Sequence, residues 1–283
     1  MVLTGSDVYV VSPLFTSAET ATDTGSTPTV VCTRSDGTVL AAPVVSDPTA
    51  ADGLYRALLL AATHVDRVDV LTIVWSGTVD GLTTALTQTV EVNGGRYVTI
   101  PELRAGRGMS DTAKYPTAML AEIVAGLEHT AEDVVGVAFV PRHQIDRLTG
   151  DGSTSLLLSK RSARTIIAVT IDDVAVTASS FEIDGRSITY SSGFTSAAVV
   201  VVEYSHGLDV PPSDLRREVL RLARQEALGE SAPLGQNIIS QQIDGISTQF
   251  GTPNPAVGRW TGDMAFDAVL TRLRSKHRTP GFA

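Results

Sequence analysis

The sequence predicts a multi-domain α+β protein, with an N-terminal β-sandwich followed by helices and a second β region. Two observations predict this fold class. Short β-branched segments separated by turn signals fill the first hundred residues, and apolar residues at helical spacing first occur after them. The chain has 283 residues, of which 43% are apolar, so it is long enough for two domains with buried cores.

Residues 1–105 are expected to form the β-sandwich. The dipeptide Asp36-Gly37 predicts a hairpin. The segment 68–77 is apolar on both faces, as an inner strand is, and 96–100 is expected to be the last strand. Trp75 is a candidate core residue of the inner strand. Short strands with regular turns make this region similar to small sandwiches of the immunoglobulin or fibronectin type.

Residues 109–283 follow a Gly-containing linker and contain three predicted helices, at about 112–138, 213–229 and 263–276. Each helix carries an apolar stripe, so we expect the three to pack together. The candidate helix-packing core residues are Leu120, Ile123, Leu127, Leu215, Val219, Leu222, Phe266, Val269, Leu270 and Leu273.

A β insertion, at about residues 155–204, is expected between the first two helices. Asp172-Asp173 and Asp184-Gly185 are turn signals, and the β-branched segment 197–204 is typical of a strand. After the insertion, Ser213 is the expected N-cap of the next helix.

The sequence offers no constellation typical of a catalytic or cofactor site. It has neither a Gly-rich phosphate loop nor a G-x-S-x-G elbow. The one cysteine, Cys32, excludes an intramolecular disulfide and a Cys-rich metal site. Glu128, His129, Glu132 and Asp133 are better explained as a solvated helix end than as metal ligands. We predict no enzyme activity, no metal and no cofactor; an enzyme of unrecognised type stays an alternative, because triads assemble from distant positions.

The net charge of −9 disfavours a protein that grips DNA, but it fits one that lets DNA pass. No apolar run approaches the roughly 20 residues that span a bilayer, so no membrane partner is expected. Residues 1–7 lack the basic and apolar regions of a secretory signal, so none is expected.

Two segments do not fit a plain globular monomer. One is a polar loop at 233–260, since loops of that length are usually functional or form interfaces. Its candidate contact residues are Gln236, Asn237, Gln241, Gln242 and Asp244. The other is the end of the last helix, whose unbalanced cations are Arg272, Arg274, Lys276 and Arg278. A surface loop and a solvated tail, whose cations suit a helix C-terminus, are the alternatives.

Four stretches in the second region resemble the head-to-tail connector, or adaptor, proteins of tailed bacteriophages. Together they cover about residues 109–278, and their order and spacing carry the likeness. They are Val137-Ala138-Phe139-Val140-Pro141-Arg142, the β insertion, the segment from Val202 to Arg217 with Ser205-His206-Gly207 and Pro211-Pro212, and Gly258-Arg259-Trp260-Thr261-Gly262 before the last helix.

The resemblance implies a helical connector core with a β insertion. It also implies a twelve-copy ring in the virion neck, made in the host cytoplasm, that lies below the portal and lines the DNA channel. The expected partners are further copies of the chain, the portal protein, a tail-side stopper or neck protein, and genomic DNA that passes without sequence-specific binding. No catalytic residue is expected.

By the same resemblance, the cations at the end of the last helix are candidate portal contacts, and the polar loop is a candidate for inter-subunit or stopper contacts. The N-terminal β domain is an addition to the minimal family pattern. A carbohydrate- or host-surface-binding module carried by that domain is the alternative function.

Overall fold

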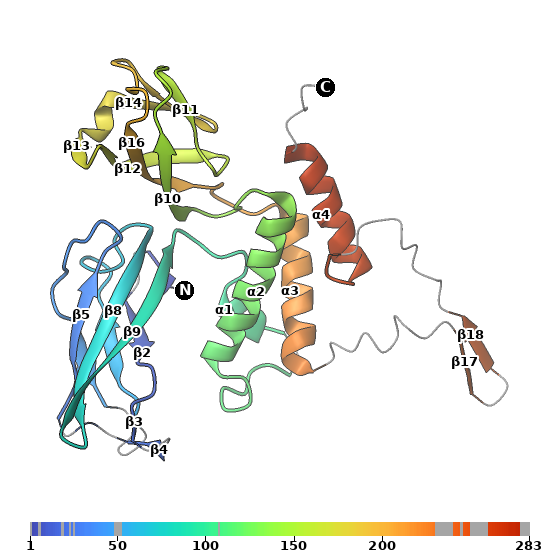
Figure 1. Cartoon of the computed structure of the whole chain (residues 1–283). Helices are drawn as coiled ribbons and strands as arrows, with labels where there is room; N and C mark the ends of the chain where they lie inside the picture. The colour runs from blue at the N-terminus through green and yellow to red at the C-terminus, as the bar shows by residue number, and fades with distance from the viewer. Residues whose placement is uncertain are drawn as a thin grey trace. The chain divides into compact units, whose positions relative to one another are not determined.

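The computed structural model describes residues 2–4, 7–17, 20–22, 24, 26–47, 53–106, 108–229, 240–243, 246–249 and 260–277. The mixed α+β class predicted from the sequence is confirmed: these residues form several sheets and four α-helices (Figure 1). Contacts divide the chain into two compact units. The first unit comprises Met1–Gly95 and Val140–Asp209, and the second comprises Arg96–Phe139 and Val210–Ala283.

The first unit contains the N-terminal β region, whose main sheet has the strand order β1-β9-β8-β5. Its strands are β1 (Val2–Leu3), β5 (Thr29–Thr33), β8 (Asp69–Val79) and β9 (Leu82–Asn93). β1 pairs in parallel with β9, and the other pairs are antiparallel. Asp80 and Gly81 both have positive φ, 51° and 77°, which suits the tight turn between β8 and β9.

Smaller sheets complete the N-terminal β region. One has the order β2-β7-β6, and the other pairs β3 with β4. The strands are β2 (Val8–Val11), β3 (Thr16–Ser17), β4 (Thr20–Ala21), β6 (Val44–Ser46) and β7 (Arg56–Leu59). Alternate residues of β8, namely Leu71, Ile73 and Trp75, are fully buried, so Trp75 lies in the core as expected. The immunoglobulin-like assignment stays a prediction.

The strand expected at 96–100 is wrong, and the first residues of the expected linker are helical. β9 ends at Asn93, and residues Ile100–Arg104 form the short helix α1. Thr99 caps this helix: its hydroxyl accepts from the backbone N–H of Glu102, and the Glu102 carboxylate accepts from the Thr99 N–H at 2.9 Å. The T-x-x-E capping box was the sequence signal for this helix.

The second β region belongs to the first unit and has a main antiparallel sheet of order β10-β16-β12-β13. Its strands are β10 (Arg142–Thr149), β12 (Ala163–Ile171), β13 (Val174–Val176) and β16 (Val199–His206). A smaller sheet has the order β11-β15-β14, and its strands are β11 (Ser155–Leu157), β14 (Phe181–Asp184) and β15 (Ser187–Tyr190). The turns at Asp172-Asp173 and Asp184-Gly185 join β12 to β13 and β14 to β15. Strand β10 begins before the expected insertion.

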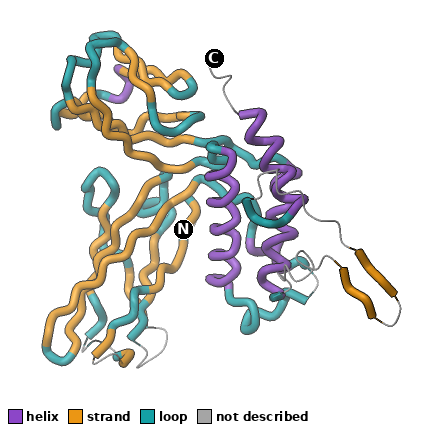
Figure 2. The backbone as a smooth tube through the Cα atoms, turned by 45° about the vertical axis from the view of Figure 1, so that its right-hand side comes forward, coloured by secondary structure: helices purple, strands orange, loops and turns teal. Residues whose placement is uncertain are grey.

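The second unit contains three longer helices, α2 (Thr117–Val135), α3 (Ser213–Leu228) and α4 (Met264–His277), each of which packs on the other two (Figure 2). α2 and α3 end at Gly136 and Gly229, whose φ values of 77° and 70° suit a left-handed C-cap. The expected N-cap Ser213 is instead the first residue of α3, because Pro212 occupies the cap position.

The candidate helix-packing residues divide into two groups. Four are half-buried, namely Ile123, Leu127, Leu222 and Val269. The buried ones are Leu120, Leu215, Val219, Phe266, Leu270 and Leu273. Between α3 and α4, residues Ser240–Ile243 (β17) and Ile246–Gln249 (β18) form an antiparallel hairpin within the predicted polar loop.

Gly94 is expected to be intolerant of a side chain. Its N–H donates to the Pro141 carbonyl at 2.9 Å, and an added Cβ would lie 2.6 Å from Pro141 Cβ. We expect Gly94→Ala to lower the free energy of unfolding by about 1–3 kcal/mol in urea titrations, as overpacking does. Gly126→Ala is the control, because a Cβ at this helical position meets no atom within 4 Å; it should raise stability by about 0.5–1 kcal/mol. Equal effects of the two changes would show that the Pro141 ring leaves room for a side chain at Gly94.

Candidate functional site

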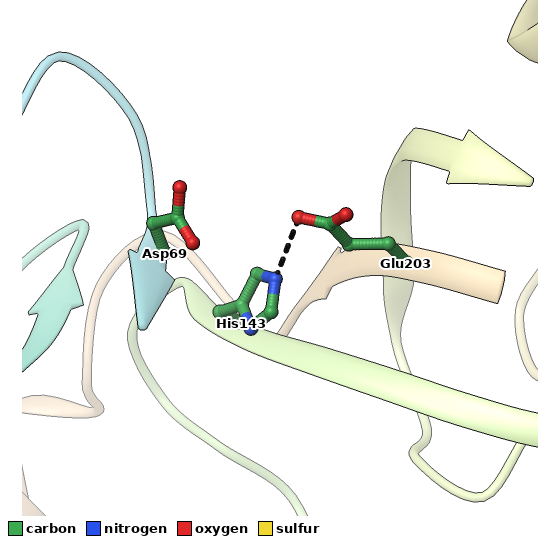
Figure 3. Close-up of side chains that lie close together, drawn as sticks. All are labelled: Asp69, His143 and Glu203. Atoms are coloured by element: carbon green, nitrogen blue, oxygen red, sulfur yellow. Dashed lines mark hydrogen bonds and ion pairs between the residues drawn. The ribbon is translucent and has the colours of Figure 1, made fainter. Parts of the chain in front are cut away.

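A buried polar cluster joins the N-terminal β region to the second β region within the first unit. We define the polar cluster as Arg34, Ser35, Arg67, Asp69, His143 and Glu203. Asp69 is the first residue of β8, His143 lies on β10 and Glu203 on β16, and their side chains converge (Figure 3). His143 stands opposite Ser205 and Ile145 opposite Glu203, so His143 and Glu203 are diagonal neighbours on one face of the sheet.

The polar atoms of the cluster lie within hydrogen-bond distance of one another. His143 Nε2 is 2.9 Å from Glu203 Oε1 and 3.2 Å from Ser35 Oγ. Ser35 Oγ is also 2.6 Å from Asp69 Oδ1 and 2.9 Å from Glu203 Oε1. The side chains of Asp69, His143 and Glu203 are only 0%, 3% and 6% exposed. The single proton of the Ser35 hydroxyl therefore serves two buried carboxylates.

Two guanidinium groups compensate the carboxylate of Asp69. Arg34 Nη1 donates to Asp69 Oδ2 at 3.0 Å, and Arg67 Nε donates to the same oxygen at 3.2 Å. Burial raises the pKa of Asp69, but hydrogen bonds from Ser35, Arg34 and the Val70 N–H together outweigh it, so the pKa lies below its ordinary value. Asp69 is therefore held as the anion.

The donor set of Asp69, His143 and Glu203 resembles a metal site in composition, since one ligand atom of each lies within 4.8 Å of the others. The surroundings fit an ion-pair network better. Both oxygens of Asp69 already accept hydrogen bonds, and a cation there would lie beside the positive charges of Arg34 and Arg67. That no metal binds here stays a prediction, and the nearby charges of Arg34 and Arg67 support it.

The cluster also differs from a hydrolytic triad. In a triad the acid holds Nδ1 of the histidine, and Nε2 is left for the nucleophile. Here Ser35 and Glu203 both approach Nε2 of His143. The arrangement stabilises buried charges through shared hydrogen bonds, but it does not present an activated serine.

A second group of buried polar residues lies on the other face of the β10–β16 pair. Asp146 accepts from the Ser159 N–H and hydroxyl, both at 2.6 Å, and from the Tyr204 hydroxyl at 2.8 Å. His206 is buried, and its Nδ1 has no hydrogen-bond partner within the described ranges. Burial, followed by the charges of Lys160 and Arg142, lowers the pKa of His206 to about 4. His206 is therefore neutral at neutral pH.

The residues considered for a metal site on α2 are not all at a solvated helix end. His129 and Asp133 are exposed, but Glu128 is fully buried and accepts from the Tyr97 N–H at 2.6 Å. Glu132 accepts from the Tyr97 hydroxyl at 3.0 Å. The two carboxylates thus hold the segment that precedes α1 against α2, and the interpretation as a solvated end is wrong for Glu128.

The cations near the C-terminus have different environments. Arg272 forms an ion pair with Asp214 of α3, and the guanidinium of Arg274 lies over the Trp260 ring, 5.5 Å from its centroid. Lys276 is exposed, and Arg278 lies outside the described residues.

Among the loop candidates, Gln241 and Gln242 belong to β17, opposite Thr248 and Ser247. The other three, Gln236, Asn237 and Asp244, lie outside the described residues.

Sequence reasoning missed the polar cluster, because its members come from four separate places in the chain and no local spacing connects them.

Fold and site together define a mixed α+β protein in which a β region lies in the sequence between two packed helices. No helix in the described ranges is both long and apolar enough to cross a membrane.

Comparisons with known proteins find similarity only among solved structures. No family profile and no curated protein matches the chain. Among solved structures, the chain is similar to one described as "Neck of empty GTA particle computed with C6 symmetry", a gene transfer agent particle. The sequences are 19% identical, the TM-score is 0.37, and the match covers 46% of this chain and 76% of the other.

Acid is expected to destabilise the protein through His206 first. Its pKa is about 6.5 in the unfolded chain and about 4 in the folded one, so the unfolded state binds more protons between these values. Stability should therefore fall as pH drops from 6.5 to 4, by about 3 kcal/mol in all. His206→Gln should remove this dependence in chemical denaturation at several pH values. The exposed His129→Gln is the control, and a slope that survives His206→Gln would contradict the assignment.

Asp69→Asn is expected to be strongly destabilising. The change leaves Arg34 and Arg67 without their buried anion, and breaking such a pair costs about 3–5 kcal/mol. Asp173→Asn, at an exposed turn position with a φ of 64°, is the matched control and should change stability by less than about 0.5 kcal/mol. Thermal unfolding measures both, and a silent Asp69→Asn variant would show that the cluster does not hold the unit together.

Proposed function

We propose that this protein is a structural component of a phage-type virion neck, where copies form a ring between the portal of the head and the tail. One observation carries the proposal: the order α2, β10 to β16, α3, α4, in which the helices pack together although a β region separates α2 from α3. This order agrees with what the connector resemblance of residues 109–278 implies. The proposed copy number is twelve, as the resemblance implies.

Charge supports a channel that DNA passes through without sequence-specific binding. The chain has a net charge of −9, and carboxylates repel phosphates. A channel surface with an excess of carboxylates would therefore not retain DNA electrostatically.

The proposed portal contact is the end of α4. Arg272 and Arg274 are engaged by Asp214 and Trp260 within the chain, so the contact is proposed to involve Arg278, the last of the four candidate cations. The hairpin β17–β18, with Gln241 and Gln242, is proposed to contact a neighbouring copy or the tail-side stopper. No enzyme activity and no cofactor are proposed.

The binding-module alternative receives no support from the aromatic residues of the N-terminal β region. A carbohydrate platform needs exposed aromatic rings. This region has four aromatic residues, all described, of which Phe15, Tyr55 and Trp75 are buried. Tyr9 alone is exposed and does not form a platform.

Electron microscopy with class averaging tests the neck role. The purified chain is imaged alone and mixed with a portal protein from the same genome, and a ring stacked coaxially on the portal is the expected result. Arg278→Glu should weaken portal binding about tenfold or more, since the change is repeated in every copy. Lys114→Glu, at an exposed position of the second unit, is the matched control. A chain that ignores the portal would overturn the proposal.

A further inference from the structure

A groove of about 600 Å³ lies along one flank of α2, with α3 at its edge. Its apolar lining consists of Met119, Ile123 and Leu127, which are spaced four residues apart on a single helix face. Two carboxylates, Glu122 of α2 and Glu226 of α3, also line it. The remaining lining residues are Gly126 and Thr130.

This flank is distinct from the face that α2 buries in its own unit. The buried face consists of Leu120, Val124, Glu128, Ala131 and Val135. By contrast, Met119 is 38% exposed and Ile123 and Leu127 are half-buried. A Cβ added at Gly126 would meet no atom within 4 Å, so there is open space above the middle of the flank. An apolar strip beside open space is suited to receive another helix.

Helix α4 offers a surface that complements the groove. Its exposed face carries Met264, which is 69% exposed, then the small residues Ala265 and Ala268, then Arg272, which pairs with Asp214 of the same copy, and last the cation Lys276. The one acid of this helix, Asp267, is buried. The exposed face therefore combines small and apolar side chains with the positive charge of Lys276, whereas the groove is apolar and acidic.

The exposed face of α4 cannot reach the groove of its own copy. α4 packs on α2 and α3 through the opposite face, with Phe266, Leu270 and Leu273 buried. The occupant must come from another molecule, and the charge pattern selects a second copy of this chain.

We propose that α4 of one copy docks its exposed face in the α2–α3 groove of the next copy, with Lys276 near the carboxylates of Glu122 and Glu226. Groove and occupant are different patches, so the contact is heterologous, and copies joined in this way can close into a ring. The inference rests on the proposed neck function, which requires a subunit contact, and it identifies the surfaces that make this contact.

Disulfide cross-linking of the full chain tests the contact. The double variant Gly126→Cys with Ala268→Cys places one thiol in the groove and one on the α4 face. Each copy then carries both halves, so mild oxidation should give a ladder of trimers and larger species, while either single variant stops at dimers. The native Cys32 does not interfere, because it is buried and burial raises its pKa to about 11. The matched control combines Gly126→Cys with Glu182→Cys, an exposed position on β14.

Charge reversal checks the same contact independently. In the double-cysteine background, Glu122→Lys with Glu226→Lys should lower the yield of the ladder at least about tenfold. Adding Lys276→Glu should restore it in part, whereas the control Glu182→Lys should leave it unchanged.

The experiment is run with and without the portal, which separates the two proposals. A ring on the portal without a ladder above the control would overturn this interface and leave the neck role standing. A ladder from a chain that ignores the portal would support the interface and overturn the neck role.

Discussion

The antiparallel pairing of β10 with β16 is the constraint on which the arrangement of the chain depends. Arg142 stands opposite His206, and the register continues without a break to Thr149 opposite Val199. Neighbouring strands lie about 5 Å apart, so the two ends of the second β region leave it side by side. The helices that precede and follow this region are therefore joined at adjacent points. For this reason α2 and α3 can pack as neighbours although they are distant in sequence. The ladder offsets the entropy of closing so long a loop.

The same strand pair carries buried polar or charged side chains on both faces. His143 and Glu203 meet Asp69 and Ser35 on one face, while Asp146 and His206 lie on the other. Such groups add little net stability compared with apolar residues, but removing one partner is costly. Their effect is to fix which residues of the N-terminal β region face the second β region, since an apolar contact alone tolerates sliding. Both regions belong to one compact unit, so residues 1–95 are more than an appended module.

In the second unit, a buried carboxylate accepts a hydrogen bond from the backbone. Glu128 is buried among the packed helices and accepts from the Tyr97 N–H, which holds the segment before α1. Glu128 shares the buried face of α2 with Leu120 and Val124, whereas Ile123 and Leu127 lie half-buried on the flank. A monomer gains nothing from an apolar flank that stays half-exposed. In the ring that we propose, the same flank would be the surface that each copy presents to the next.

Local patterns in the sequence were enough to predict the mixed α+β class, the approximate positions of α2, α3 and α4, the turn at Asp184-Gly185 and the burial of Trp75, because periodicity and turn chemistry are local. The sequence also contains the Thr99 capping box, which went unrecognised beside a β-branched segment. The polar segment Arg142–Thr149, by contrast, is a strand because its partner β16 pairs with it. Tertiary contacts likewise brought positions 35, 69, 143 and 203 together and buried Glu128. Those outcomes depend on contacts between distant residues, and no local pattern encodes such contacts.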